Sequence, residues 1–329
     1  MKIFSDALSE YIYDRNINIS ALSAETGIER TLIHKFISGK RTPSDIRSVI
    51  RISDGLMLSF DERAALCDSY RFTYMGADNY ERCKKIKKIA DYLSNLPDPL
   101  ILRSSAPSEP LIPAISKDKL STEMMIKRII SDGSTKKISL IAPPAHTVTE
   151  SELISACLNR PELQIVQLLT MSNTSVDFNI SILENIIPLL VFCDKYTPLI
   201  NYCSVSERIN SAALMPNLIL TEKYAFNFSN TCDKGILHTR TDILKLYNLV
   251  FSDAEEKSSS LIDRKISSAP GDSETTVKIN DNLYIESNER RLSLVYRTGS
   301  FWNSILIYEQ SLRKAIKESL EFIMPLSMS

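Results

Sequence analysis

Glycine is scarce in this sequence, and the motifs that depend on it are absent. The 329 residues include 8 glycines, none of which forms a G-x-G-x-x-G, P-loop or G-x-S-x-G motif. Loops that bind phosphate groups through backbone amides need closely spaced glycines, because a side chain would block the approach. The acidic residues also lack a pair at a spacing typical of acid–base catalysis. The sequence therefore predicts a protein that is not an enzyme.

Metal ligands and long hydrophobic runs are scarce as well. The three histidines lie in different segments, and the six cysteines include no C-x-x-C pair and no histidine at zinc-ligand spacing. We expect buried free thiols and no metal or cofactor, with a redox pair of Cys193 and Cys203 as the alternative. The most apolar run, 186–193, is too short to span a bilayer and contains Pro188. Because residues 1–13 lack a secretory signal pattern, we expect a cytoplasmic protein that does not enter a membrane.

Charge is balanced over the whole chain but not along it. Lys and Arg number 39 and Asp and Glu number 40, which gives a formal net charge of −1. Between Arg15 and Arg51, seven basic residues oppose three acidic ones. Because phosphate binding needs a local excess of positive charge, any contact with nucleic acid is expected in this segment.

The sharpest pattern lies in residues 18–43, NISALSAETGIERTLIHKFISGKRTP. Asn18 or Ser20 can cap a first short helix, since their side-chain oxygens accept hydrogen bonds from free backbone amides. Gly27 suits the positive φ angle that often follows a helix. Glu29 begins a second helix, where an acidic residue favours the positive end of the helix dipole. The segment therefore predicts two short helices joined by a tight turn.

The two short helices each have an apolar side, and the second also has a polar one. The apolar side chains are expected to face partner helices: Leu22, Ala24, Ile28, Leu32, Ile33, Phe36 and Ile37. The open face of the second helix carries Arg30, Thr31, His34 and Lys35. All four can donate hydrogen bonds, and a helix in the major groove reads base edges from its first turns. Three residues follow the helix stop at Gly39, where DNA phosphates would lie: Lys40, Arg41 and Thr42.

This stretch resembles the lambda-repressor-like, or Xre-type, family of helix-turn-helix proteins. The match runs from about Phe4 to about Tyr74 and is clearest in TGIERTLIHKFISGKRTP. The resemblance implies that the open face of the second helix reads bases and that the loop after it contacts phosphates. The family often has Gln at the start of the first short helix, where this chain has Ile19. That glutamine contacts a DNA phosphate, so either backbone N–H groups near Asn18 and Ser20 make this contact instead, or the affinity is modest.

The N-terminal domain is expected to cover residues 1–75. Further amphipathic helices are predicted at 5–16, 44–56 and 61–70, which gives a five-helix helix-turn-helix bundle. Residues 76–117 are predicted to form a connector helix and a linker, since five prolines occur between positions 97 and 113. The helix carries a short apolar seam beside a basic face: Cys83, Ile86, Ala90 and Leu93. It is interpreted either as a connector or dimer helix, or as a helix that packs on a domain with its basic face in solvent.

Residues 118–329 are predicted to form a mixed α/β region for sensing or dimerisation, because strand and helix patterns alternate. Strands are expected at 137–142, 164–171, 199–205, 217–221, 225–229, 282–287, 291–296 and 301–308. Helices are expected at 118–131, 150–158, 182–192, 242–251 and 310–323. Residues 252–276 are polar and serine-rich, so we expect a mobile connection that would also subdivide the region. The stretch from NLILTEKYAFNF to GILH weakly resembles degenerate phospholipase-D-like effector domains, which implies a non-catalytic role.

Together these patterns predict a multidomain fold of the α plus α/β class. The predicted function is a sequence-specific transcriptional regulator that binds a double-stranded DNA operator as a homodimer. A small-molecule or peptide effector would act on the C-terminal region. Two alternatives remain open. The helical bundle could contact protein, as in an antitoxin or anti-repressor, or the chain could be an enzyme with an appended DNA reader, which would need a polar pocket within residues 118–329.

Overall fold

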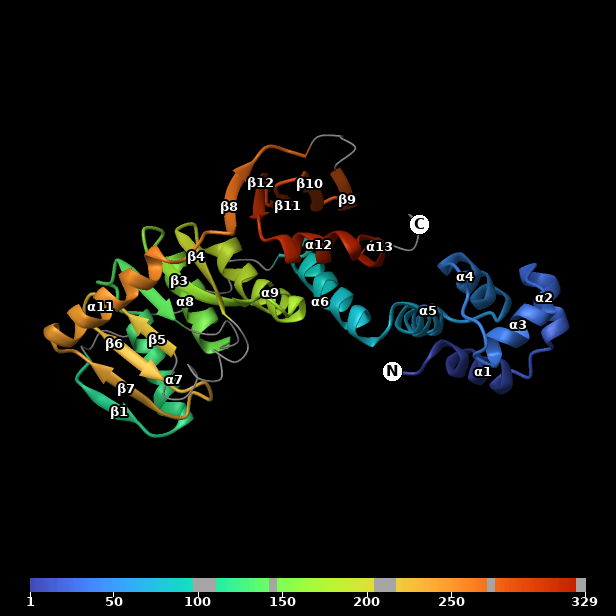
Figure 1. The fold of residues 1–329 in the computed structure, drawn as a ribbon, viewed down its shortest axis with the longest axis horizontal. Coiled ribbons are helices and arrows are strands. Elements are labelled where there is room, and N and C mark those ends of the chain that lie inside the picture. Colours follow the sequence, from blue (N-terminus) through green and yellow to red (C-terminus); the bar gives the residue numbers. More distant parts are fainter. Residues whose placement is uncertain (97–110, 142–146, 204–216, 271–275, 324–329) are drawn as a thin grey trace. The chain divides into compact units, whose positions relative to one another are not determined.

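The computed structural model describes residues 1–96, 111–141, 147–203, 217–270 and 276–323. The chain forms two compact units, Met1–Lys84 and Lys85–Ser329, and each is described by itself. The first unit contains only helices, whereas both sheets of the protein lie in the second (Figure 1). The predicted division into a helical N-terminal region and an α/β C-terminal region is therefore confirmed.

The N-terminal unit consists of short helices in close succession. They are α1 (Phe4–Asp14), α2 (Ile19–Thr26), α3 (Arg30–Ile37), α4 (Ile46–Gly55), α5 (Phe60–Met75) and the first turns of α6 (Ala77–Ser94). Helix α5 is longer than the expected 61–70. It begins early because Ser59 and Glu62 form a capping box, and it continues until Gly76, whose φ of 81° ends the helix.

Aromatic side chains form the centre of this unit. The ring of Phe4 lies 6.4 Å from that of Phe36 and 6.0 Å from that of Tyr70, both in edge-to-face geometry. All three side chains are buried. Helices α1, α3 and α5 are therefore joined through one cluster, which fixes the orientation of α3.

The larger sheet of the second unit has seven strands in the order β1-β7-β6-β5-β2-β3-β4. The strands are β1 (Ala114–Ser116), β2 (Lys137–Ile141), β3 (Gln164–Ser172), β4 (Tyr196–Cys203), β5 (Asn217–Leu220), β6 (Ala225–Phe228) and β7 (Gly235–His238). Strands β2, β3 and β4 are parallel, and every other neighbouring pair is antiparallel. The mixed sheet agrees with the predicted α/β class, while β1 and β7 were not expected.

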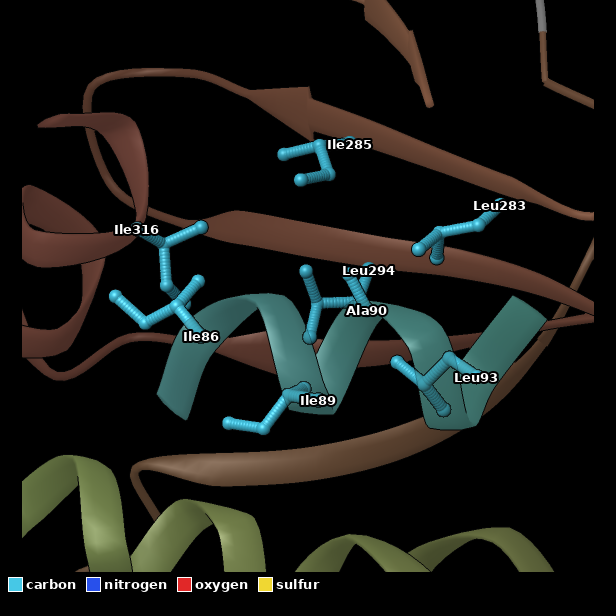
Figure 2. Close-up of a pocket in the computed structure, with 8 residues that line it drawn as sticks. All are labelled: Ile86, Ile89, Ala90, Leu93, Leu283, Ile285, Leu294 and Ile316. Atoms are coloured by element: carbon cyan, nitrogen blue, oxygen red, sulfur yellow. The ribbon is translucent and has the colours of Figure 1, made fainter. Parts of the chain in front are cut away.

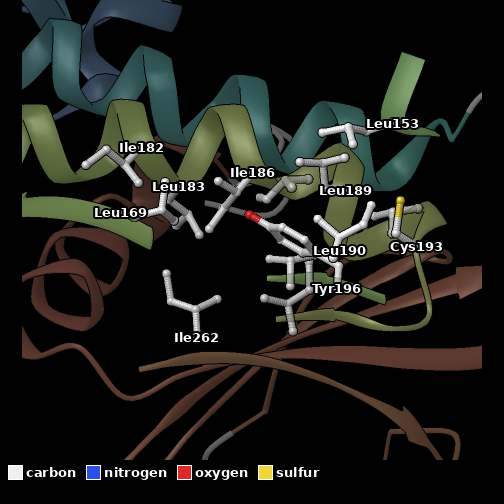
Figure 3. Close-up of a cluster of buried hydrophobic side chains, with 14 of the residues drawn as sticks. Leu153, Leu169, Ile182, Leu183, Ile186, Leu189, Leu190, Cys193, Tyr196 and Ile262 are labelled. Carbon is white, nitrogen blue, oxygen red and sulfur yellow. The ribbon is translucent and has the colours of Figure 1, made fainter. Parts of the chain in front are cut away.

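Helices cover both faces of this sheet. Because side chains alternate along a strand, Ile165 and Leu169 of β3 face one core and Val166 and Leu168 face another. The first core receives α7 (Lys119–Ile130), α8 (Thr147–Asn159) and α9 (Val176–Phe192). The second receives α11 (Thr241–Glu256). Figure 3 shows the first core, where side chains of α9 surround Tyr196.

The apolar run 186–193 is part of this buried helix rather than a membrane segment. Ile186, Leu189 and Leu190 are buried in the core, and Pro188 lies inside α9. No helix in the described ranges combines the length and the hydrophobicity that a membrane crossing requires.

The smaller sheet is antiparallel throughout, in the order β8-β12-β11-β10-β9. Its strands are β8 (Ile262–Ser267), β9 (Thr276–Asn280), β10 (Leu283–Ser287), β11 (Leu292–Thr298) and β12 (Phe301–Ile307), and α12 (Gln310–Glu318) and α13 (Leu320–Ile323) follow. The expectation of a mobile connection over 252–276 is wrong for its described part, 252–270, while 271–275 lie outside the described residues. Helix α11 extends into it, and β8 pairs with β12, so backbone hydrogen bonds hold a segment whose side chains are mostly polar.

The second half of α6 belongs to this unit. Ile86, Ala90 and Leu93 pack against β10, β11 and α12, as Figure 2 shows. The space left among these side chains is lined only by apolar groups and is about the size of one water molecule. The apolar seam of the expected connector is therefore a packing surface inside the chain. Most of the expected linker, 97–110, lies outside the described residues, and β1 lies near its end.

Candidate nucleic-acid interface

Helix α2 begins at the cap that the sequence indicates. The Oδ1 atom of Asn18 accepts hydrogen bonds from the backbone amides of Ser20, at 2.8 Å, and Ala21, at 3.4 Å. At the other end, Gly27 has a φ of 67°, and its amide donates to the carbonyl of Ser23. The predicted positions of the cap and of the left-handed glycine are therefore confirmed.

The turn between α2 and α3 is held by two hydroxyl groups. Ser23 Oγ donates to the carbonyl oxygen of Ile28 at 2.7 Å. Thr26 Oγ1 donates to the carbonyl oxygen of Leu22 at 2.7 Å and accepts from the amide of Ile28 at 3.3 Å. Hydroxyls in the last turn of a helix often bond to nearby backbone in this way, so Ser23 and Thr26 are a signal for this turn that the sequence also carries. The expectation for Ala24 is wrong, because Leu22 is buried while Ala24 is exposed.

Helix α3 divides sharply into a buried and an open side. Ile33 and Phe36 are 0% and 3% exposed. The side chains that are exposed on this helix, apart from the cap residues, are Arg30, Thr31, His34 and Lys35. At about 100° per residue, these four occupy one arc on the side opposite the buried pair. The structure thus brings together all four of the predicted base-reading residues on one open helix face.

Most of the hydrogen-bond donors on this open face of α3 have no partner among the described residues. Within the part of the chain that the structure describes, the side chains of Arg30, His34 and Lys35 form no hydrogen bond or ion pair. Thr31 Oγ1 donates to Glu29 Oε2 at 3.3 Å. Glu29 is the N-cap residue of α3, but its side chain makes no capping bond. The face therefore offers free donors with a single acidic neighbour at its start.

The loop after α3 places two basic side chains beside the end of the helix. Gly39 has a φ of 68°, and the amide of Arg41 donates to the carbonyl of Lys35 at 3.2 Å. Lys40 and Arg41 are exposed, while Thr42 is half-buried. Both basic residues are thus positioned to reach a ligand that contacts α3, and Thr42 is less accessible.

Asn18 and Ser20, near which a phosphate contact was expected in place of the family's glutamine, already form hydrogen bonds at the cap of α2. The Asn18 side-chain oxygen and the Ser20 amide bind each other. The donors that these two exposed residues still offer are the Asn18 Nδ2 and Ser20 Oγ groups.

Not all of the local basic charge is free. Arg15 donates to the carbonyls of Leu56 and Met57 and binds both carboxylate oxygens of Glu62. Hydrogen bonds from Ser59 and Arg15 lower the pKa of Glu62 to about 2. Arg51 donates to the Thr26 carbonyl and to Ser48 Oγ. Of the seven basic residues, those left exposed without such bonds are Arg30, Lys35, Lys40, Arg41 and Arg47.

Polar side chains of the second unit form hydrogen bonds with one another, as where Asn179 Nδ2 donates to the Ser172 carbonyl and to Ser311 Oγ. Among the described residues, no cluster of three His, Cys, Asp or Glu side chains could hold a metal ion. His238 ends β7, and its ring lies 5.8 Å from that of Tyr247. The buried cysteines of the described chain, which form no disulfide bond, are Cys67, Cys83, Cys157, Cys193 and Cys232. Of the alternative redox pair, Cys193 is a free thiol in the core, and the side chain of Cys203 lies outside the described residues.

Comparison of the chain with protein-family models, with curated proteins and with solved structures found no match. The geometry of α2, α3 and the loop that follows is therefore the basis for inferring a function.

The position of α2 depends on close contact with α4 at Gly55. A Cβ atom there would lie 2.8 Å from both Leu22 Cδ1 and Thr26 Cγ2. We expect Gly55→Ala to destabilise the N-terminal unit by about 1–3 kcal/mol, because Leu22 and Thr26 would have to move and Thr26 also holds the turn. Thermal unfolding followed by circular dichroism would measure the loss, with the exposed-site variant Ala24→Ser as control. An unchanged melting temperature for Gly55→Ala would contradict this packing.

Proposed function

We propose that this protein is a sequence-specific DNA-binding regulator whose N-terminal unit is a helix-turn-helix reader of the lambda-repressor-like type. The observation that carries the proposal is the open face of α3, where Arg30, Thr31, His34 and Lys35 gather while the opposite side is buried. A helix in the major groove needs such a row of donors, since base edges there present acceptors such as the O6 and N7 atoms of guanine. Lys40 and Arg41 at the end of the helix suit phosphate oxygens.

The proposed roles predict two different kinds of loss. Arg30→Ala should lower affinity for the selected operator by about tenfold or more and relax the base preference, because a bidentate base contact is lost. Lys40→Ala should weaken binding to all duplexes alike and reduce the salt dependence by about one unit of slope, because one phosphate contact is lost. The operator would be selected from random duplexes and affinities measured by fluorescence anisotropy at two salt concentrations.

The control for these measurements is Lys314→Ala, which removes an exposed positive charge on α12 of the second unit. It should bind the selected duplex like the unchanged protein. Equal loss of base preference in Arg30→Ala and Lys40→Ala would contradict the division of roles. Failure of the unchanged protein to enrich any duplex would contradict DNA reading itself.

The rest of the proposed function concerns the second unit. We propose that the protein acts in the cytoplasm as a homodimer without catalytic activity, and that the α/β unit pairs the two copies and responds to a small molecule or peptide. The proposal is supported by the helices that cover both faces of the larger sheet and by the lack of the catalytic motifs named above.

A second candidate function is protein binding by the N-terminal unit. Met57, in the turn before α5, and Phe60, the first residue of α5, are 78% and 85% exposed. Adjacent exposed apolar side chains often mark a protein contact. Salt distinguishes the two functions, since DNA binding should fall steeply as ionic strength rises and apolar protein binding should not.

A further inference from the structure

We propose that the outer face of α11 is the surface through which two copies of this chain pair, antiparallel and related by a two-fold axis. The inference rests on the proposed function in one respect only, that a dimeric regulator needs such a contact. Its surface belongs entirely to the second unit, and dimerisation itself is measured without DNA.

Helix α11 is apolar on both sides. On the inner side, Leu244 and Phe251 are 7% and 2% exposed and pack on the seven-stranded sheet. On the outer side, Leu246, Leu249 and Val250 are 60%, 70% and 56% exposed. A helix that only covered a sheet would carry polar residues on this outer side.

The three outer residues form one continuous stripe. Leu246 lies three residues before Leu249 and four before Val250, which is the spacing of neighbours on one helix face. Clustered exposed apolar side chains of this kind mark interaction sites in soluble proteins. The 16-residue helix is about 24 Å long, enough to pair with a second helix over four turns.

Charges at the two ends of the stripe identify the partner as a second copy. Asp242 lies seven residues before Leu249, and Lys257, the C-cap residue, lies seven residues after Val250. Two such helices that cross antiparallel at Leu249 and Val250 would place Asp242 of each copy opposite Lys257 of the other. A parallel arrangement would place like charges together, and it would also align the two helix dipoles unfavourably.

Asp242 and Lys257 can form ion pairs with a second copy, because the ion pairs that they form within one chain lie at the surface. Asp242 binds Arg240, and Lys257 Nζ binds Asp253 at 2.7 Å, all with side chains more than half exposed. In the paired state Lys257 would lie between Asp253 of its own chain and Asp242 of the second copy. A contact with two-fold symmetry is complete when two copies have paired, so it yields dimers rather than open-ended assemblies. Such a dimer matches two operator half-sites that are related by the same symmetry.

The first test measures association of the full-length chain without DNA by sedimentation velocity over a range of concentrations. We expect the unchanged protein to form dimers, and Leu249→Glu to raise the dissociation constant by about tenfold or more, because it places two carboxylates at the centre of the apolar contact. The matched control is Leu120→Glu on α7, which changes a leucine that is 66% exposed on another surface. A monomeric unchanged protein, or equal dimerisation by Leu249→Glu, would overturn the proposal.

A charge exchange tests the antiparallel geometry independently of the apolar centre. Asp242→Lys and Lys257→Asp should each weaken the dimer by about three- to tenfold, and the double variant should restore it, because each end again meets its opposite charge. Additive weakening in the double variant would overturn the antiparallel arrangement. Binding of each monomeric variant to a single half-site duplex is measured separately, so a failure of dimerisation is distinguished from a failure of DNA reading.

Discussion

Gly235→Ala is expected to destabilise the seven-stranded sheet by about 3 kcal/mol or more. Gly235 is the first residue of β7, and it pairs with Phe228 of β6 and Ser116 of β1. A Cβ atom at this position would lie 2.6 Å from Phe226 Cε2, closer still to Phe226 Cζ, and 2.8 Å from Ser116 Oγ. Each of these separations is shorter than van der Waals contact, so the surroundings would have to move.

The surroundings have little freedom to do so. The Phe226 side chain is 0% exposed, and its ring stacks on that of Phe228 at 5.5 Å. Ser116 Oγ is buried as well and accepts a hydrogen bond from Thr122 Oγ1 at 2.8 Å. Displacing either group would disturb a packed core, which is the reason for the large expected cost.

Denaturant unfolding followed by circular dichroism would measure this effect. Gly133→Ala is the matched control, because a Cβ atom at Gly133 meets no atom within 4 Å and the residue has no positive φ. That variant should stay within about 0.5 kcal/mol of the unchanged protein. If Phe226 is the obstacle, Phe226→Leu combined with Gly235→Ala should lose less stability than the sum of the two single changes. Similar stabilities for Gly235→Ala and Gly133→Ala would contradict the packing around β7.

The second large effect concerns pH and Glu150. Burial raises the pKa of this carboxyl on α8 from its ordinary value of 4.5 to about 7. The folded state therefore holds a proton that the unfolded state releases between about pH 4.5 and 7. The contribution of this group to stability is full below this window and falls as the pH rises through it, by about 3 kcal/mol once the carboxyl is ionised in both states. Within the described residues, Glu150 has no hydrogen bond or ion pair that would offset the buried charge.

The expected signature is a difference in pH dependence between two proteins. Glu150→Gln carries no charge at any pH, so its free energy of unfolding should lack the fall that the unchanged protein shows between about pH 5 and 8. The exposed-site variant Glu256→Gln on α11 should keep that fall. Urea unfolding at pH 5, 6.5 and 8 would measure all three proteins. If the free energy of unfolding changed with pH in the same way for the unchanged protein and for Glu150→Gln, the Glu150 carboxyl would not be the cause of the fall.

The sequence was informative where short-range rules decide the structure. Asn18 caps α2 and Gly27 takes a left-handed conformation because these are local properties of a side chain and a backbone. The apolar spacing of Ile33 and Phe36 predicted the buried side of α3, and the same spacing left Arg30 and its neighbours exposed. Most helices and strands of the second unit were found for the same reason, since periodicity reflects which face is buried.

The sequence was uninformative where distant segments decide the structure. Strand β8 reads as a polar loop, because only its pairing with β12 makes it a strand. Strand β1 has only three residues and depends in the same way on β7. Ala24 resembles a core residue by composition, yet the packing of α2 leaves it exposed.

The sequence by itself determined the two-part organisation of the protein, the caps and turn of α2 and α3, and the row of donors from Arg30 to Lys35. These depend on residues within a few positions of one another, whose conformations are set by local sterics and hydrogen bonding. The tertiary structure alone decided which basic residues are free, because Arg15 bonds to carbonyls more than 40 positions away. It likewise decided that α11 is apolar on two sides, since burial of Leu244 and exposure of Leu249 depend on where the sheet lies.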